Sequence, residues 1–569
     1  MSLLSGGGFY TWCLAFPNPI VEPATFGGAV MAKDTKHGLD RRGILAGAAA
    51  MGVALGAPKA LASTPVVNTK YGKIRGLSDG AVKIFKGVPY GAPTSGEGRF
   101  LPPKPPAPWS DVRDATMLGH RAPQTDTAGF MEEEVVALDR TPQSEDCLCL
   151  NIWTAGDGKK RPVMLWCHGG GFTGGSGGNI RYDGASLAKK HGVVLVTVNH
   201  RLNAFGFLYL AKLGGDKYAD SGNVGMLDIV AALNWVKDNI AEFGGDPGNV
   251  TIFGQSGGAS KVTTAMAMPQ AAGRFHRVIA ESGVALKAIT PDEGSEIASR
   301  LMTQLGVSQV DQLQQVPFPQ IVAALGPLGP AGRFGPVLDH RNLVSGNGPF
   351  DPLAPSLSAD VPMILGSTLT EITFLNTTPL DAIDDETLRR DLRRDLKLDD
   401  AEVEKMIALY KRDFPGAANV RLYQIIASDN WLTANVALTA QRKAALGKAP
   451  AYLYHFEKLT PVHNGKLGVP HTLEVSYVFD NLDGPTDDVI TGTGKDRYPL
   501  ADKMSRAWTQ FARTGDPNVA DLPHWRPYSA SDRAVMIFND TCKLAVDPRA
   551  EARQAITELH VRQGQVSGA

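Results

Sequence analysis

The chain has 569 residues, of which 43% are hydrophobic and 20% charged, a composition typical of a folded globular protein. Its formal net charge of −1 provides no basic field for nucleic acid, so we expect no nucleic-acid partner. The body of the chain has no run of about 18 uncharged apolar residues, so we expect no membrane span there.

The first sixty or so residues have the layout of an export signal. Arg41–Arg42 precede an Ala/Gly-rich apolar run at 46–57, and Ala60–Ala62 then give a small-x-small cleavage pattern. The arginine pair favours the twin-arginine route, so we predict that residues 1–62 are a leader and that the mature protein is periplasmic or secreted. A cytosolic helix behind two arginines is the alternative. Met31 is a candidate for the true start.

The remaining chain predicts an α/β fold. Residues 65–120 alternate short apolar runs with turn signals, which predicts antiparallel strands. Further on, helical periodicity, as at 227–243, separates continuous apolar runs, which indicate strands covered on both faces. These runs are 162–167, 193–198, 250–253 and 361–365. The alternation predicts a large, mostly parallel central sheet flanked by helices. Since no low-complexity linker or repeat interrupts it, we interpret residues 63–569 as a single domain.

The cysteines do not suggest a disulfide framework or a metal site. There are five, at Cys13, Cys147, Cys149, Cys167 and Cys542. Cys147 and Cys149 point the same way in an extended strand, which is poor disulfide geometry. A bridge between Cys147 and Cys542 stays open. We expect neither a metal nor another cofactor.

A Gly-x-Ser-x-Gly motif follows the apolar run at 250–253. A serine between glycines on a strand-to-helix turn is typical of a nucleophile elbow, because the glycines let the backbone bend sharply and leave the hydroxyl exposed. The following helix directs its free amides at developing negative charge. We therefore predict that Ser256 is a nucleophile, with a surface turn as the alternative for so short a motif.

A second glycine-rich segment, His168–Phe172, comes directly after the predicted strand 162–167. Glycines at a strand end expose backbone amides that can hold an oxyanion. We predict an oxyanion hole formed by the amides of Gly170, Gly171 and Gly257. A flexible loop is the alternative.

Several further motifs match the signature segments of one protein family, and they occur along the chain in the same order as in that family. They are Phe85–Tyr90, Ser144–Ile152, Asn199–Arg201 with Gly206–Leu208, Phe243–Gly258 and Ala512–Asn518. Over roughly residues 65–550 the chain resembles the type-B carboxylesterases, which include cholinesterases and bacterial para-nitrobenzyl esterases. The resemblance implies the α/β-hydrolase fold with helical insertions over the site. The charge-rich segment 384–413 has a pattern typical of helices. We interpret it as part of such an insertion, with its charges on a solvated face.

The resemblance also implies a Ser–Glu–His triad in that chain order. His471 lies in the segment that resembles the family's histidine segment, and the nearby His463 does not. Glu371 follows the predicted strand 361–365 by a short loop, although its surroundings depart from the usual Asp-Glu-Gly; Asp339 is the fallback. Ser282 resembles a serine that supports the triad, with a strand-end cap as the alternative.

Two departures from the family pattern stand out. Gln255 precedes the nucleophile where the family commonly has glutamate, which argues against a specialist for quaternary-ammonium substrates. The family's usual cysteine before Pro-Gln is replaced in Ala122–Gln124, so Cys147 lacks its customary disulfide partner.

These motifs together favour an exported serine carboxylesterase that acts on a small-molecule ester through an acyl-enzyme. A long-chain lipase and a carbamate or amide hydrolase would use the same machinery. A non-catalytic binding protein is the alternative from another class, but such relatives usually lose the serine or the histidine. The physiological ester and the oligomeric state stay open.

Overall fold

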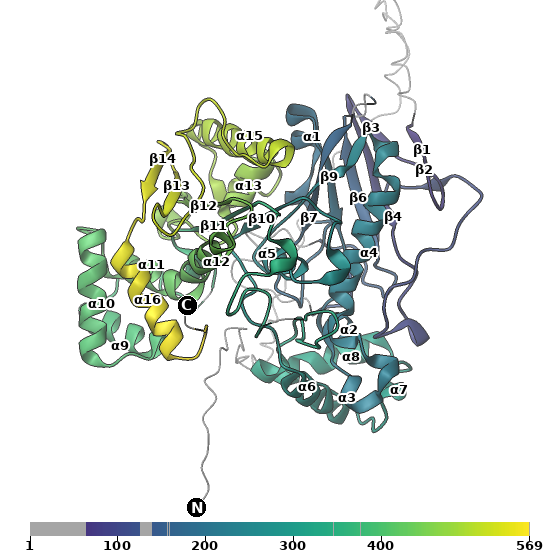
Figure 1. Cartoon of the computed structure of the whole chain (residues 1–569), viewed down its shortest axis with the longest axis horizontal. Coiled ribbons are helices and arrows are strands. Elements are labelled where there is room, and N and C mark those ends of the chain that lie inside the picture. The colour runs from purple at the N-terminus through teal and green to yellow at the C-terminus, as the bar shows by residue number, and fades with distance from the viewer. Residues whose placement is uncertain are drawn as a thin grey trace, which may run out of the picture.

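The computed structural model describes residues 64–125, 139–155, 158, 160–344, 346–375 and 377–567. The predicted leader, with Cys13 and Met31, lies outside these residues. Eleven strands form one twisted sheet in the order β14-β13-β12-β11-β10-β9-β7-β8-β6-β4-β3 (Figure 1). Its centre, from β13 to β8, is parallel, and the pairings outside it are antiparallel.

The four predicted buried strands are confirmed. They are β7 (Arg161–Cys167), β8 (Val194–Val198), β9 (Gly245–Gln255) and β11 (Met363–Thr368). The other sheet strands are β3 (Leu77–Asp79), β4 (Val82–Pro89), β6 (Cys149–Thr154), β10 (Arg277–Glu281), β12 (Ala451–Phe456), β13 (Ala534–Phe538) and β14 (Lys543–Val546). Because parallel strands run the same way, their carboxyl ends meet at one edge, where ligands bind in such sheets.

Helices cover both faces of the sheet, which explains why the strand sequences are continuously apolar. On one face lie α4 (Val224–Asn239), α5 (Gly257–Ala265) and α12 (Ala434–Ala445). On the other lie α1 (Ala185–His191), α13 (Leu473–Phe479) and α15 (Tyr498–Thr514). Successive strand residues alternate between the two cores: Leu165 packs in the first and Trp166 in the second. The α/β-hydrolase prediction therefore agrees with the observed layers.

The antiparallel prediction for residues 65–120 is correct for two pairs. β1 (Val66–Thr69) pairs with β2 (Gly72–Arg75), and β3 pairs with β4 at the edge of the large sheet. However, β2 also pairs in parallel with β5 (Arg113–Asp114), which completes a separate three-stranded sheet. The short strand β5 carries no apolar alternation, so its pairing left no signal in the sequence.

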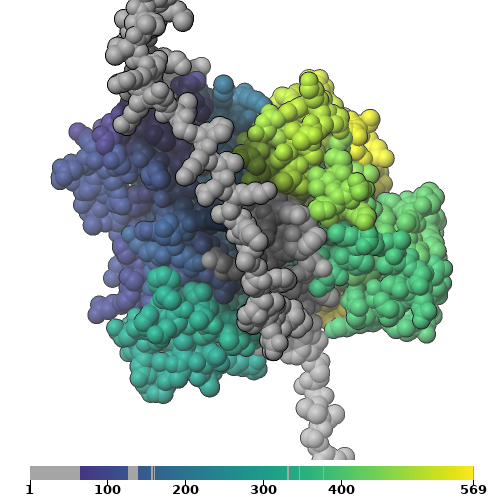
Figure 2. Space-filling view, turned by 180° about the vertical axis from the view of Figure 1, so that it is seen from behind, coloured from purple at the N-terminus to yellow at the C-terminus, as the bar shows by residue number. Residues whose placement is uncertain are grey.

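Two helical segments extend from the sheet layers as lobes on opposite sides of the molecule (Figure 2). One contains α6 (Pro291–Gln304), α7 (Val310–Leu313) and α8 (Phe318–Leu325). The other contains α9 (Asp385–Leu396), α10 (Asp400–Asp413) and α11 (Asn419–Ser428). The remaining helices are α2 (Asn203–Phe207), α3 (Ala211–Gly214), α14 (Asp488–Thr491) and α16 (Ala550–Arg562).

The charge-rich segment 384–413 forms α9 and α10, as expected for helices with one solvated face. Leu388 and Leu392 are buried, whereas Arg389 is on the exposed side and pairs with Glu404 at 2.5 Å. Surface pairs of this kind contribute little to stability. None of the helices in the described part of the chain has both the length and the apolar character needed to cross a bilayer.

Candidate active site

Ser256 occupies a sharp turn between β9 and α5. Its backbone has φ 59° and ψ −124°, a conformation that costs a non-glycine residue free energy and recurs at functional sites. The amide of Ser256 donates to the carbonyl of Glu281 at 2.8 Å, which holds the turn against β10. Its side chain is half-buried, so a substrate can reach the hydroxyl. The predicted elbow geometry is therefore present.

Glycines around the elbow permit contacts that side chains would block. A Cβ on Gly257 would overlap the backbone of Gly171, and a Cβ on Gly258 would overlap the carbonyl of Cys167. A Cβ on Gly169 would lie 3.5 Å from the Cβ of Ser256. The glycine-rich segment His168–Phe172 after β7, the glycine loop, thus lies directly on the first turn of α5.

The amides of Gly170, Gly171 and Gly257 are available to a ligand. Within the described residues, none of the three donates a recorded hydrogen bond. Gly170 and Gly171 have φ of 83° and 60°, in the left-handed region that favours glycine. This leaves three donors, one of them at a helix N-terminus, beside the candidate nucleophile. Removing one such donor typically costs about 10²–10³ in rate.

Glu371 and His471 are brought together as predicted. Glu371 begins the 3₁₀ turn Glu371–Phe374 after β11, and its Oε2 lies 2.5 Å from Nδ1 of His471. Its Oε1 accepts the amide of Thr368 at 2.7 Å. His471 is in the loop before α13, where Arg181 donates to the carbonyl of Thr472 at 3.0 Å. With Nδ1–H directed at the carboxylate, Nε2 is left as the acceptor.

The two alternatives considered from the sequence lie elsewhere. His463 is exposed in the turn Val462–Gly465. Asp339 accepts the amide of Asn342 at 2.7 Å and the side-chain amide of Asn223 at 2.8 Å, so it holds a turn together. In the described part of the chain, Asp339 has no recorded hydrogen bond to His471.

Gln255 makes a contact with the imidazole that the sequence did not reveal. Its side chain is 2% exposed, and its Nε2 lies 3.0 Å from Nε2 of His471. Within the described residues, no hydrogen bond joins Ser256 Oγ to His471. The same amide nitrogen lies 3.3 Å from Nδ1, so the Gln255 amide lies beside the imidazole between its two nitrogens, next to the one left as acceptor. A hydrogen bond of this kind contributes about 1 kcal/mol net, so substrate binding can displace it.

Replacing Gln255 by glutamate should place a carboxylate beside the imidazole of His471. The added negative charge would favour the imidazolium over the neutral ring. Because a general base acts in its neutral form, the acidic limb of the kcat/KM–pH profile should move to higher pH. The control is Gln255→Met, which adds no charge. An unchanged limb in Gln255→Glu would contradict the placement of this side chain beside the base.

Two aromatic rings lie against the imidazole of His471, and the helical segment that contains α9, α10 and α11 lies beside them. Phe374 and Trp431 have ring centroids 5.5 and 5.3 Å from that of His471. Trp431 lies in a π-helical turn, Asp429–Thr433, between α11 and α12. Such turns often occur at functional sites. Ser428 of α11 accepts the amide of Ile372 at 3.0 Å, so the insertion contacts the turn that carries Glu371.

Two more buried carboxyl groups follow on from Glu371: Glu474 interacts with it, and Glu281 interacts with Glu474. Ser282 donates to Oε1 of Glu474 at 2.5 Å, and Trp508 donates to Oε1 of Glu281 at 2.7 Å. Burial, followed by the charge of Glu371, raises the pKa of Glu474 to about 7. Burial and Glu474 raise the pKa of Glu281 well above its usual range. Ser282, which the family resemblance assigns a supporting place near the triad, thus contacts Glu474.

The described cysteines Cys147, Cys149, Cys167 and Cys542 are free thiols. The bridge between Cys147 and Cys542 that the sequence left open is not formed. Burial raises the pKa of Cys149 and of Cys167 to about 12, so neither is a reactive thiolate near neutral pH.

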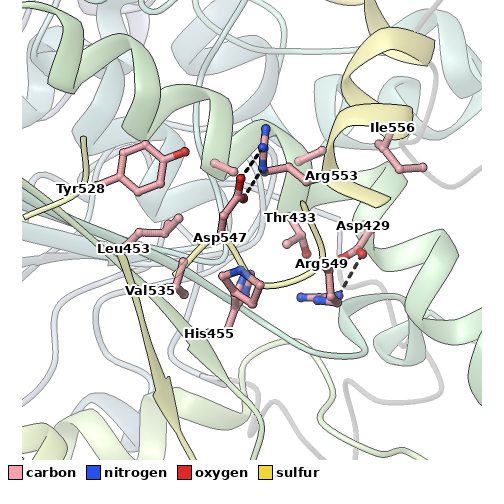
Figure 3. Close-up of a pocket in the computed structure, with 13 residues that line it drawn as sticks. Asp429, Thr433, Leu453, His455, Tyr528, Val535, Asp547, Arg549, Arg553 and Ile556 are labelled. Carbon is pink, nitrogen blue, oxygen red and sulfur yellow. Dashed lines mark hydrogen bonds and ion pairs between the residues drawn. The ribbon is translucent and has the colours of Figure 1, made fainter. Parts of the chain in front are cut away.

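A small cavity lies between β12, β13, α12 and α16, with the two ends of the π-helical turn, Asp429 and Thr433, in its wall (Figure 3). Its volume of about 30 Å³ has room for one or two water molecules. Charged side chains at its wall are already paired: Asp429 with Arg549 and Asp547 with Arg553, both at 2.9 Å. Its lining does not include the elbow or His471, so we do not interpret it as the substrate site.

Comparisons with known proteins agree with this geometry. A model described as "Carboxylesterase family" matches residues 63–556. The para-nitrobenzyl esterase of Bacillus subtilis is 33% identical, with 86% of this chain and 98% of that protein covered. Carboxylesterase 1E of Rattus norvegicus is also 33% identical, with 84% and 90% covered. The solved structure of the Geobacillus stearothermophilus carboxylesterase EST55 at pH 6.2 has a TM-score of 0.73 at 36% identity, with 86% and 99% covered.

Proposed function

Because the chain belongs to the carboxylesterase family and is a serine hydrolase of carboxylic esters, we propose that it acts through an acyl-enzyme on Ser256. His471 is the base, and Glu371 orients and stabilises its imidazolium. The observation that carries this assignment is the 2.5 Å contact between Glu371 Oε2 and His471 Nδ1. It lies beside the elbow, where three backbone amides donate no recorded hydrogen bond within the described residues.

The reaction then proceeds in two halves. Oγ of Ser256 attacks the ester carbonyl carbon while Nε2 of His471 takes its proton. The carbonyl oxygen becomes an oxyanion held by the amides of Gly170, Gly171 and Gly257. When the intermediate collapses, the ester C–O bond breaks and the departing alcohol takes the proton from His471. Water attacks the acyl-enzyme by the same route, which releases the acid and restores Ser256.

Mixing enzyme with p-nitrophenyl butyrate should give a burst of p-nitrophenolate close to one equivalent per chain, followed by slower turnover, if deacylation limits the rate. A trapped acyl group should be found on Ser256 by peptide mass mapping after acid quench. Mapping of the acyl group to another residue would contradict the assignment.

We propose small, soluble esters as the substrate class, in keeping with the para-nitrobenzyl esterase among the relatives. Rates on p-nitrophenyl esters of increasing acyl length, compared as kcat/KM, test this preference. A rate that jumps when triglyceride is emulsified would favour a long-chain lipase. Faster cleavage of matched carbamates or amides would favour those bonds.

We further propose that residues 1–62 direct export of the folded enzyme, based on Arg41–Arg42 and the cleavage pattern at Ala60–Ala62. In a host with twin-arginine export, replacing both arginines by lysine should retain the enzyme in the cytosol. Activity that still reaches the periplasm or medium unchanged would contradict this route.

A further inference from the structure

Lys261 is a lysine on α5 with no exposed surface. Lysines are almost never fully buried without a partner. The recorded partner of its Nζ is the carbonyl of His168, at 2.9 Å, and the ring of Phe172 lies 5.9 Å away. No carboxylate is recorded in an ion pair with Lys261 in the described part of the chain. The side chain therefore reaches the beginning and end of the segment His168–Phe172.

The groups that face Lys261 are neutral near neutral pH. The rings of His168 and His200 stack at 5.1 Å, and burial together with Lys261 lowers the pKa of both well below its usual range. The thiol of Cys167 stays protonated, as described above. Burial lowers the pKa of Lys261 itself to about 7. Its amine and its ammonium both donate, so the bond to His168 does not depend on which form is present.

The glycine loop is held on α5 at two points. At one end, the backbones of Gly171 and Gly257 are in close contact. At the other end, Lys261, one helical turn after Gly257, binds the carbonyl of His168. Between these points lie glycines with few steric limits on their backbone, whose conformational freedom must be restricted if their amides are to stay aimed.

We propose that Lys261 is a positioning residue that ties the start of the glycine loop to the nucleophile helix and so keeps the oxyanion amides in place. This inference rests on the proposed function, since it assigns Gly170 and Gly171 to the oxyanion hole. Lys261 does not touch the substrate. Without the tether, the amides of Gly170 and Gly171 shift, and a displacement of about 1 Å at a reacting site can cost about 10²-fold in rate.

The test uses the full chain with Lys261→Met, which has a similar length and lacks the donor. We expect kcat for p-nitrophenyl butyrate to fall by up to about 10²-fold with little change in KM. The Ki of an alkyl trifluoromethyl ketone should rise by a similar factor, because its adduct with Ser256 carries an oxyanion. The matching methyl ketone, which binds without reacting, should bind as before.

Thermal unfolding separates positioning from a purely structural role. Lys261→Met removes the cost of burying an amine but leaves the His168 carbonyl without its recorded donor, so the two effects oppose each other and the unfolding temperature should change little while the rate falls. If kcat and the trifluoromethyl ketone Ki are unchanged, the inference is overturned. It is also overturned if the loss of rate equals the loss of folded protein. Lys261→Gln, which keeps a donor on a shorter side chain, should lie between the two and gives the same reading if Lys261→Met does not fold.

Failure of the proposed function would look different. In that case the trifluoromethyl ketone would not inhibit the unsubstituted enzyme competitively, and Ser256→Ala would keep its turnover, whatever residue stands at 261.

Discussion

Replacing Ser256 by alanine should lower kcat for p-nitrophenyl butyrate by about 10⁵–10⁶-fold, the scale expected when a triad nucleophile is removed. The variant has no atom on which to form the acyl-enzyme, although the oxyanion amides remain. Its burst of p-nitrophenolate should disappear. The fold should persist, because the Ser256 hydroxyl makes no recorded hydrogen bond to the described residues and the turn is held by its backbone amide, which donates to the carbonyl of Glu281.

Ser260 offers a matched control for that experiment. It lies one turn further along α5, is half-buried, and has no part in the proposed chemistry. Ser260→Ala should keep both burst and turnover. If Ser256→Ala unfolds like the unsubstituted enzyme yet still turns over substrate, the assignment of the nucleophile is wrong.

Replacing Glu371 by glutamine should lower kcat by about 10³–10⁴-fold. The amide of glutamine can still accept the backbone amide of Thr368, so the turn should survive. It carries no charge to stabilise the imidazolium, and it can donate to Nδ1 of His471, which favours the wrong tautomer. Turnover and thermal unfolding measured on the same preparation separate lost chemistry from lost structure.

Asp339→Asn is the matched control, because Asp339 was the other candidate acid. Its two oxygens hold the turn before Asn342, so this variant should lose stability and keep its kcat. A large loss of kcat in Asp339→Asn, together with normal kcat in Glu371→Gln, would exchange the two assignments.

Sequence patterns were sufficient where the signal is local. Continuous apolar runs gave β7, β8, β9 and β11, because burial on both faces leaves no room for polar alternation. The elbow and the glycine loop were also visible, since glycine is favoured at the left-handed angles of the loop and at the close contacts beside Ser256. The contact of Glu371 with His471 was expected from the family resemblance together with the place of Glu371 after a buried strand, even though its neighbours differ from the family pattern.

The unpredicted features depend on which distant segments meet. Gln255 contacts His471 only because the loop before α13 returns to the end of β9. The pKa of Glu474 is raised by burial and by Glu371, neither of which can be derived from its neighbours in sequence. In the sequence, Lys261 cannot be told from any other lysine of a helix. Its burial under the glycine loop became apparent only from the structure.

The most direct test of the account is a crystal structure of the full chain inactivated by a fluorophosphonate. We expect phosphorus bonded to Oγ of Ser256, with the phosphoryl oxygen about 2.7–3.1 Å from the amides of Gly170, Gly171 and Gly257. We also expect the Gln255 side chain moved away from Nε2 of His471. Phosphorus on a different residue, or a phosphoryl oxygen that none of these amides contacts, would contradict it.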